Sequence, residues 1–455
     1  MISLLEVAER ARSGPKMDEK DWNLGLFRRM QELAREYGLE RLGREVFFDV
    51  DPGYADDAFQ AAVDFIVSEG VFCFPLCRVL KFTEEEVRAA LEETPREVTV
   101  GLGRDARTLR KREIQDTRPT NCIGGLHSPY SEDLGSLVPV NFAMIPRMDI
   151  IEGFNTTTTD GREIFGPPLE GYAARRELAW MREGVRKAGR PGMAISYYPI
   201  NTRAATMIAP IDPDYGLRRT DGVLIKPLPD LKVEVDMLTA AIVYNEYGSY
   251  IFGGGASSIG GFCGGPEGAI IEAIAKVLVS ILVYRGCMFN TGVGRLGFAE
   301  ERVTMPPIWP TSMVHHALCR NSNAVRFAGL TYSGLGPGTE LCLWERAADA
   351  VVTTILGSNF YITRKGRPEP NEGQTPLEVE FRIEVSDAML KAGMKTDWAA
   401  EILQRISERL VGKPTLPGKK IQECYDLVRH RPSPEYEQTY QKVKADLVDM
   451  GLEFE

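Results

Sequence analysis

The sequence lacks the features that mark membrane-spanning and secreted chains. It contains no run of eighteen apolar residues, and its first 22 residues carry charges every few positions without an apolar segment. We therefore expect a cytoplasmic protein without a membrane-spanning helix. The net charge of -10 and the pI near 5.3 also disfavour partners such as nucleic acid and anionic membranes, because the average surface field repels both.

Cysteine and histidine are scarce. The eight cysteines are scattered over 455 residues, mostly beside apolar residues, which predicts buried, reduced thiols. The closest pair, Cys73 and Cys77, has no histidine nearby in sequence, so we expect core packing there rather than zinc. None of the four histidines lies in an HxH, HExxH or HxCx motif: His127, His315, His316 and His430. We expect no metal site of the chain's own, and no GxSxG motif or Cys/His signature marks a nucleophile.

The chain changes pattern near residue 119. Residues 1–118 read as a helical and hairpin extension, with helices at 55–69 and 83–93 and a hairpin at 97–115 that turns at Gly103–Asp105. Residues 119–455 alternate short apolar runs with longer helical periods, which indicates βα units and favours a (βα)8 TIM barrel, although a doubly wound sheet alternates in the same way. The clearest helices in this part are at 269–285 and 339–356. The predicted strands are Cys122–Leu126, Met148–Phe154, Met193–Tyr198, Ser249–Phe252, Cys287–Asn290, Val325–Tyr332, Asn359–Thr363 and Val379–Ile383.

A glycine-rich segment, Phe252–Gly268, holds eight glycines in seventeen residues and leads into a helix. Such density indicates that bare backbone approaches a ligand closely, and Gly253, Gly255, Gly260 and Gly261 are the candidates for cofactor contact. A dinucleotide fingerprint is only partly matched, because Ser258 stands where its third glycine should be, and no Walker motif follows. The alternative is a barrel loop that needs tight turns for structural reasons.

Polar residues at or just after predicted strands are candidates for the site, because the carboxyl ends of barrel strands hold it. His127 closes one strand, although a packed or capping histidine explains it equally well. The remaining candidates of this kind are Asn201, Asn290, Arg295 and Tyr332. For each of them a structural hydrogen bond is the competing interpretation.

Several segments, in order over nearly the whole chain, resemble the monomethylamine:corrinoid methyltransferases. They are GLGRDARTLRKR (101–112), SPYSEDL (128–134), KAGRPGM (187–193), GGFCGGPE (260–267), GPGTELCL (336–343), KKIQECYDL (419–427) and the tail from PEYEQTYQKVK to GLEF (434–454). The resemblance implies a TIM barrel, a homo-oligomer (a hexamer in this family), and transfer of a substrate methyl group to the cobalt of a cobalamin carried by a separate corrinoid protein. This is the chemistry of an EC 2.1.1 methyltransferase of one-carbon metabolism.

The departures from the family pattern concern the substrate pocket. Family members carry pyrrolysine shortly after the GRPGM-like segment, where this chain has Ser196 or Tyr197, and neither side chain can form the amine adduct. By the same resemblance the partner glutamate falls on Gly254 and the partner glutamine on Leu330, whereas a tyrosine is kept as Tyr332. We expect these five residues, with His127 and Asn290, to line the substrate pocket.

The resemblance without pyrrolysine predicts a small methylated donor other than monomethylamine. A quaternary amine is the attractive replacement, because its charge already activates the methyl group and tyrosines such as Tyr197, Tyr198 and Tyr332 could offer cation–π contacts. Two other functions stay open: a barrel enzyme that binds a nucleotide at the glycine-rich segment, and a non-catalytic binding protein for methylated ligands.

Overall fold

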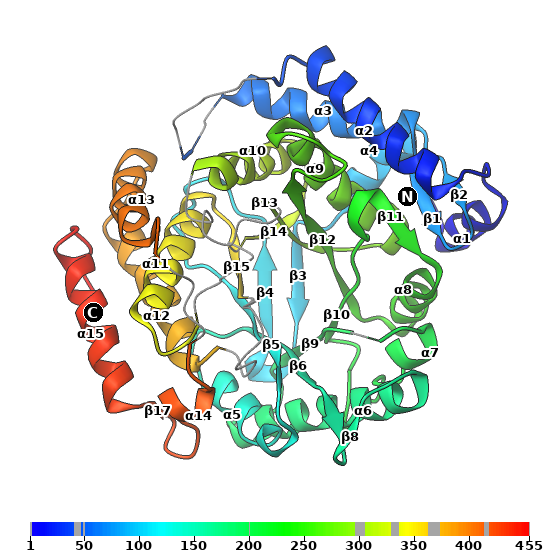
Figure 1. Cartoon of the computed structure of the whole chain (residues 1–455). Coiled ribbons are helices and arrows are strands. Elements are labelled where there is room, and N and C mark those ends of the chain that lie inside the picture. Colours follow the sequence, from blue (N-terminus) through cyan, green and yellow to red (C-terminus); the bar gives the residue numbers. More distant parts are fainter. Residues whose placement is uncertain are drawn as a thin grey trace.

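Eight parallel strands close into a barrel in the computed structural model, which describes residues 2–40, 47–48, 51–199, 201–295, 305–328, 336–362, 374–413 and 418–454 (Figure 1). Each strand pairs with the next one along the barrel, and the last pairs with the first. In chain order they are β5 (Cys122–Tyr130), β6 (Ile150–Thr156), β9 (Ala194–Tyr197), β10 (Gly222–Leu224), β12 (Tyr250–Ile259), β13 (Met288–Arg295), β14 (Val325–Ala328) and β15 (Asn359–Ile362). The predicted TIM-barrel fold is confirmed.

One of the strands predicted for the barrel is wrong, and one of its eight strands was missed. Val379–Ile383 lies inside a helix, α12 (Pro376–Lys391), although its apolar and polar residues alternate as in a strand. The alternation is uninformative because the helix is buried on most sides and its polar residues find partners: Arg382 pairs with Asp349, and Glu378 accepts a 2.7 Å hydrogen bond from Tyr436. The missed strand, β10, has three residues, too few to show a period.

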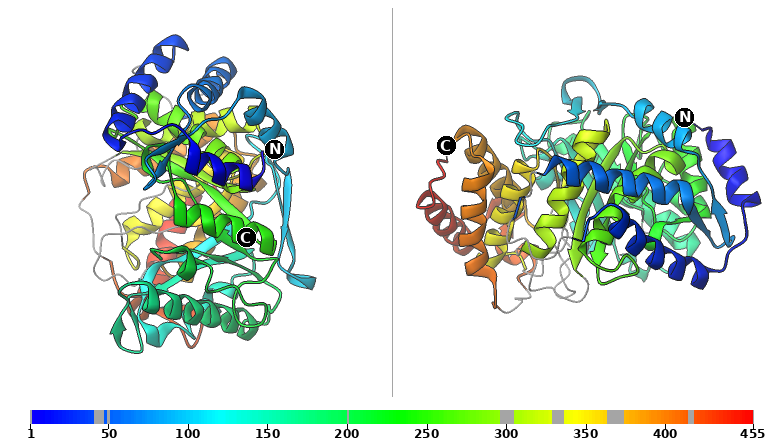
Figure 2. Two further views of the ribbon diagram at one scale, coloured as in Figure 1. Left: turned by 90° about the vertical axis from the view of Figure 1, so that its right-hand side faces the viewer. Right: turned by 90° about the horizontal axis from the view of Figure 1, so that it is seen from above.

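The strand residues alternate between two hydrophobic clusters. Those facing outward, such as Ile151 and Ile195, pack against the surrounding helices. Those facing inward, such as Phe252 and Phe327, form the barrel interior. The predicted hairpin, β3 (Glu97–Val100) and β4 (Arg107–Arg110) around the 3₁₀ turn η1 (Gly103–Asp105), places Val98, Val100 and Leu109 in the interior cluster and so closes one end of the barrel (Figure 2).

The helices of the extension cover one flank of the barrel (Figure 1). Helices α3 and α4 were expected, and α4 begins with the capping box of Thr83 and Glu86. The small sheet of this flank joins the extension to the barrel region, because β1 (Val71–Phe74) pairs with β2 (Arg78–Leu80) and with β11 (Lys232–Glu234). The extension helices are α1 (Leu4–Ser13), α2 (Glu19–Glu36), α3 (Pro52–Ser68) and α4 (Glu84–Glu93).

Helix α9 (Pro266–Tyr284) lies between β12 and the extension, and every residue from Glu267 to Tyr284 is buried. The expected helices at 269–285 and 339–356 correspond to α9 and α11. The other helices after residue 119 are α5 (Val138–Ala143), α6 (Pro167–Lys187), α7 (Ala204–Met207), α8 (Val235–Tyr247), α10 (Met305–Asn321), α11 (Glu340–Ile355), α12, α13 (Thr396–Leu410), α14 (Ile421–Cys424) and α15 (Pro434–Val448), with 3₁₀ turns η2 (Glu132–Leu134) and η3 (Pro229–Leu231).

Two short hairpins complete the fold: β7 (Thr158–Thr159) with β8 (Arg162–Glu163), and β16 (Tyr425–Asp426) with β17 (Arg431–Pro432). The two termini lie on opposite sides of the molecule (Figures 1 and 2). Each of the eight cysteines has a free thiol, and all except Cys77 are buried. Across the described ranges no helix has the length and apolar character that crossing a bilayer requires.

Candidate active site in the barrel interior

A buried carboxylate and a hydroxyl lie side by side inside the barrel. Glu152 on β6 is fully buried, and it accepts a hydrogen bond from the hydroxyl of Ser196 on β9. The two residues are register partners on adjacent strands, and both alternate with residues that face the outer helices, which directs their side chains inward. A carboxylate in this position gives the interior a negative group.

Just after β10, the strand next to β9, an ammonium meets an amide and two aromatic rings. Lys226 follows β10 by two residues, and its Nζ donates a 3.0 Å hydrogen bond to Oδ1 of Asn290 on β13. The same Nζ lies 4.7 Å from the ring centre of Tyr361 and 5.7 Å from that of Phe252. The two rings contact each other edge to face, with centroids 4.9 Å apart. The ammonium is thus held by cation–π contacts as well as by the amide.

Tyr361 connects the two charged groups. Burial raises the pKa of its phenol well above the usual value, and the negative charge of Glu152 raises this pKa further. The Tyr361 phenol therefore stays protonated at neutral pH and can donate a hydrogen bond. The Tyr361 hydroxyl lies close enough to Glu152 for the charge of Glu152 to raise the pKa of the phenol. The Lys226 ammonium lies over the face of the Tyr361 ring.

The structure separates Ser196 and Tyr197, the two residues expected from the resemblance to stand at the pyrrolysine position. Ser196 faces the interior, whereas Tyr197 belongs to the hydrophobic cluster between the strands and the outer helices. The Tyr197 hydroxyl donates to Asn201, and burial raises the pKa of this phenol. The Tyr197 side chain therefore packs away from the interior groups, and its role in the substrate pocket stays a prediction.

Of the other predicted pocket residues, Asn290 lies in the interior and Gly254 is its register partner on β12. His127 lies within β5, but its side chain is among those the structure does not describe, as is that of Arg295 on β13. Leu330 and Tyr332 lie outside the described residues. Their pocket roles stay predictions.

The first three glycines of the glycine-rich segment are strand residues rather than loop residues, because β12 extends to Ile259. A Cβ on Gly253 would lie 2.7 Å from Cβ of Ser280, and one on Gly255 would lie 3.5 Å from Lys276, both on α9. A Cβ on Gly254, where φ is +83°, would lie 2.1 Å from the carbonyl oxygen of Asn290. The contacts of Gly253 and Gly254 give a packing reason for these two glycines, and Gly255 has φ +151°, which side chains rarely adopt. These observations favour the structural alternative over a nucleotide site.

The second half of the segment is a closed turn at the carboxyl end of β12. The amide of Gly260 donates to the carbonyl of Gly264, and that of Gly264 donates to Gly261. Helix α2 covers one side of this turn, where Gln31 donates a long 3.5 Å hydrogen bond to the carbonyl of Cys263. Gly260 is exposed, with open space where a Cβ would stand, so contact of this turn with a cofactor stays a prediction.

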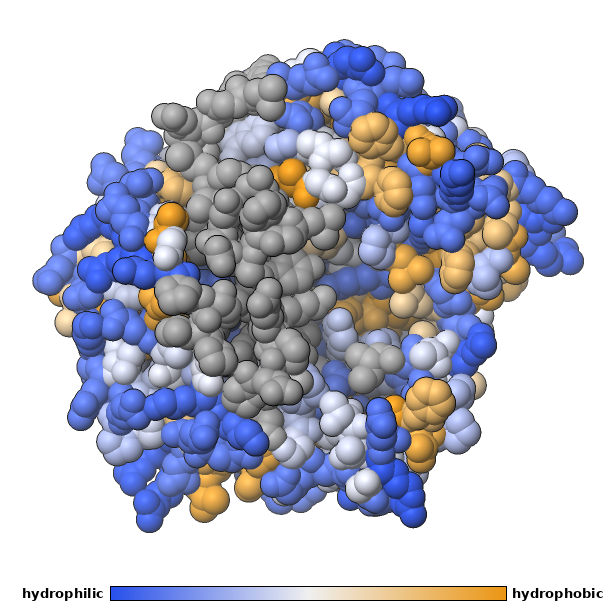
Figure 3. All heavy atoms as spheres, in the orientation of Figure 1, coloured by the Kyte–Doolittle hydropathy of each residue, from blue (hydrophilic) through white to orange (hydrophobic). Residues whose placement is uncertain are grey.

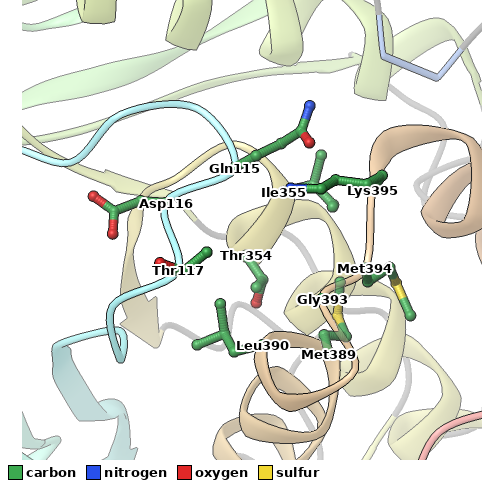
Figure 4. Close-up of a pocket in the computed structure, with 10 residues that line it drawn as sticks. All are labelled: Gln115, Asp116, Thr117, Thr354, Ile355, Met389, Leu390, Gly393, Met394 and Lys395. Atoms are coloured by element: carbon green, nitrogen blue, oxygen red, sulfur yellow. The ribbon is translucent and has the colours of Figure 1, made fainter.

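A hollow outside the barrel is lined by polar and apolar residues at the end where the strands begin (Figure 4). Gln115 and Thr117 precede β5, and Met394 lies between α12 and α13. Because the strands begin here, the hollow is at the opposite end from the expected site, and none of the interior polar groups faces it. No group of three or more metal-binding side chains occurs within the described ranges.

The sequence reasoning missed Glu152, Lys226 and Tyr361. Glu152 and Tyr361 occupy predicted strands, so a systematic check of the inward positions of each strand would have identified them. Lys226 had no such signal, because its strand was too short to recognise.

Comparisons with known proteins agree with this architecture. The family model described as monomethylamine methyltransferase MtmB matches residues 2–452. Relatives include monomethylamine methyltransferase MtmB2 of Methanosarcina acetivorans and MtmB of Methanosarcina mazei, each 28% identical over 98% of this chain and 97% of the relative. The crystal structure of the Methanosarcina barkeri enzyme matches with a TM-score of 0.90 and 25% identity over 99% of this chain and 98% of its own, and a hydroxylamine complex of MtmB matches with the same TM-score at 26% identity. With the family model matched over residues 2–452 and the barrel matched by a solved member, the chain belongs to the monomethylamine methyltransferase MtmB family.

Proposed function

We propose that the protein transfers a methyl group from a small methylated ammonium compound, such as a quaternary amine, to the cobalt of a corrinoid protein. The observation that carries this proposal is the buried carboxylate of Glu152 in the barrel interior, hydrogen-bonded to Ser196 and close to Tyr361. A buried carboxylate beside an aromatic residue favours binding of a cation.

The enzyme works without pyrrolysine in this proposal. At the position of the family's electrophile, the Ser196 hydroxyl is engaged with Glu152 and Tyr197 faces the outer helices. A hydroxyl cannot capture methylamine as an adduct. The donor must therefore arrive with its methyl group already activated, as a positively charged nitrogen activates it, and monomethylamine is not expected to react.

The cobalt is the methyl acceptor, so it is a substrate on the partner protein rather than a resident metal. It supplies a strong nucleophile in its cobalt(I) state, and the methyl carbon–nitrogen bond breaks with its electron pair left on nitrogen. The residues of this chain bind and orient the donor. Glu152 attracts the ammonium, and the attraction falls once nitrogen has lost its charge, which favours release of the amine product.

The partner must dock on the face that carries the carboxyl ends of the strands. On the face seen in Figure 3, apolar side chains gather over the N-terminal helices within a largely hydrophilic surface. Phe27 on α2 and Phe262 in the glycine turn are 43% and 42% exposed, and the turn packs against α2. We assign these two rings to the docking surface for the corrinoid protein. The proposal keeps the family's homo-oligomer and a cytoplasmic location.

A methyl-transfer screen tests this function. The purified protein is incubated with cob(I)alamin and, separately, with mono-, di-, tri- and quaternary methylamines and methyl ethers, and methylated cobalamin is followed by its absorbance spectrum. We expect product with charged, fully methylated donors and none with monomethylamine. If no donor of the panel yields methylated cobalamin, either with free cob(I)alamin or with a corrinoid protein as acceptor, the proposal is contradicted.

The docking assignment has its own control. Phe262→Asp should slow transfer to a corrinoid protein but leave transfer to free cob(I)alamin unchanged, because the free cofactor needs no protein surface. Tyr215→Asp, at an exposed aromatic residue on another part of the surface, should change neither rate. Equal loss with both acceptors would place Phe262 in the reaction itself rather than in docking.

A further inference from the structure

Two hydroxyl groups approach the buried carboxylate of Glu152 from opposite sides of its strand. Ser196 donates to it from β9, the strand next to β6. The phenol of Tyr361 also hydrogen-bonds to it, from β15, which is separated from β6 by β5. A carboxylate can only accept, so both hydroxyls act as donors. Two donors from different directions restrict the orientation of this carboxylate more than either does alone.

The register of the barrel brings Tyr361 and Glu152 together across β5. Tyr361 is in register with Ile123 of β5, and Glu152 is in register with Gly125, two residues further along the same strand. The phenol therefore starts from a position nearer the amino ends of the strands than Glu152. Because Gly125 has no side chain, β5 places none beside Glu152 at this level, and the long side chain of Tyr361 reaches the carboxylate.

The ring of Tyr361 is itself held in place. Its edge-to-face contact with Phe252 has a centroid distance of 4.9 Å, and Nζ of Lys226 lies 4.7 Å from its centre. The Tyr361 side chain is buried, so bulk water does not compete for its hydroxyl. A ring fixed by such contacts holds its hydroxyl in one direction, as the supporting residues of a preorganised site do.

We propose that Tyr361 is a positioning residue, which acts with Ser196 to hold the carboxylate of Glu152 in the orientation that attracts the methyl donor. This inference rests on the proposed function and deepens it, because it names a further residue on which donor binding depends. Tyr361 transfers no proton in this role and acts only through Glu152. Its loss should weaken the binding of a cation and leave the methyl-transfer step itself little changed.

Tyr361→Phe tests this role, because it removes the hydroxyl and keeps the ring with its contacts to Phe252 and Lys226. Binding of tetramethylammonium is measured by titration calorimetry without cobalamin, and methyl transfer is measured with cob(I)alamin. We expect Kd and KM to rise about fivefold, the effect of losing one of two hydrogen bonds to a charged group. We expect kcat to change by less than about twofold.

Tyr244→Phe is the matched control. Tyr244 is fully buried in the cluster outside the barrel interior, and its hydroxyl donates a 2.7 Å hydrogen bond to the carbonyl of Met207. This substitution should lower the melting temperature as Tyr361→Phe does, but it should leave Kd and KM at their wild-type values. The melting temperatures of both variants show that they are folded.

A double-variant cycle separates positioning from general packing. Glu152→Gln removes the charge that Tyr361 orients, so Tyr361→Phe should weaken binding little further in that background. If Tyr361→Phe weakens binding by the same factor with and without the Glu152 charge, Tyr361 acts through packing and the inference is overturned. Wild-type binding in Tyr361→Phe, or a loss confined to kcat, overturns it as well.

Failure of the inference can be told from failure of the proposed function. If Glu152→Gln weakens binding of tetramethylammonium and Tyr361→Phe does not, the inference is wrong and the proposed function stands. If the wild-type protein neither binds tetramethylammonium nor transfers a methyl group from any charged donor, both are wrong.

Discussion

Ser196 on β9 donates a hydrogen bond to the buried carboxylate of Glu152 on β6, its register partner on the adjacent strand. The hydrogen bond joins two neighbouring strands inside the barrel and orients the carboxylate of Glu152. The proposed function relies on this pair, with Glu152 as the group that attracts a positively charged donor.

Replacing Glu152 by Gln should weaken binding of a charged donor. The substitution keeps the shape and an acceptor for Ser196 but removes the negative charge, and we expect KM for a cationic donor to rise by about tenfold or more, as for loss of a buried charge contact. Steady-state transfer to cob(I)alamin measures it. Glu183→Gln on α6, at a partly exposed carboxylate, is the matched control and should behave as wild type. An unchanged KM in Glu152→Gln would show that this carboxylate does not bind the donor.

Replacing Gly254 by Ala should destabilise the barrel. The residue has φ +83°, and the new Cβ would lie 2.1 Å from the carbonyl oxygen of Asn290, so strand separation or backbone strain of at least about 2 kcal/mol is expected. Chemical denaturation measures the free energy of unfolding. Gly25→Ala on α2, where a Cβ meets nothing within 4 Å, should leave stability unchanged or raise it by up to about 1 kcal/mol. Equal effects of the two substitutions would refute the packing argument for Gly254.

Lys276 and Glu272 form a buried ion pair on α9 at 3.0 Å, and Nζ of Lys276 also donates to the carbonyl of Ala256 on β12. Lys276→Met leaves Glu272 buried without its partner charge, and we expect a loss of about 3–5 kcal/mol in the free energy of unfolding. The double variant with Glu272→Leu removes both charges and should recover part of this loss. Additive losses in thermal or denaturant unfolding would mean that the two side chains do not act as a pair.

Glu177 on α6 should make stability depend on pH. Burial raises the pKa of its carboxyl to about 7, although hydrogen bonds from Thr156 oppose the shift. Because the folded-state pKa lies above the value of about 4.3 in an unfolded chain, the contribution to stability is fully present below about pH 4.3 and is lost as pH rises to about 7. The loss amounts to about 4 kcal/mol, since the two pKa values differ by about 2.7 units and each unit corresponds to about 1.4 kcal/mol.

The variant Glu177→Gln isolates this contribution. We expect it to be more stable than wild type at pH 8 and to show a flatter dependence of the unfolding free energy between pH 5 and pH 8. Glu183→Gln on the same helix should keep the wild-type dependence. A wild-type slope that survives in Glu177→Gln would assign the titration to another group.

The sequence predicted elements correctly where the deciding residues lie close together in the chain, and less well where the deciding contacts join distant segments. Helix α4 was predicted from Thr83 and Glu86, three residues apart, which cap each other in the structure. Helix α12 was mistaken for a strand, although Thr375 and Glu378 form the same kind of signal at its start. The alternation of apolar and polar residues at 379–383 is uninformative, because a helix buried on most sides has no polar face to display. The three-residue strand β10 is ordered by its neighbours β9 and β12 rather than by its own pattern.

The sequence by itself determined the alternation of strands and helices, the hairpin, the presence of helix α9 and the family resemblance, because these depend on caps, periodicity and ordered motifs within short stretches. Only the tertiary structure decided which side chains meet. Ser196 reaches Glu152 across 44 residues, and Lys226 reaches Asn290 across 64. The closure and register of the barrel set these pairs, and they also turned Tyr197 outward while its neighbour Ser196 faces the interior. Register depends on the pairing of strands that are far apart in the chain, so the pattern of residues within one short segment does not predict it.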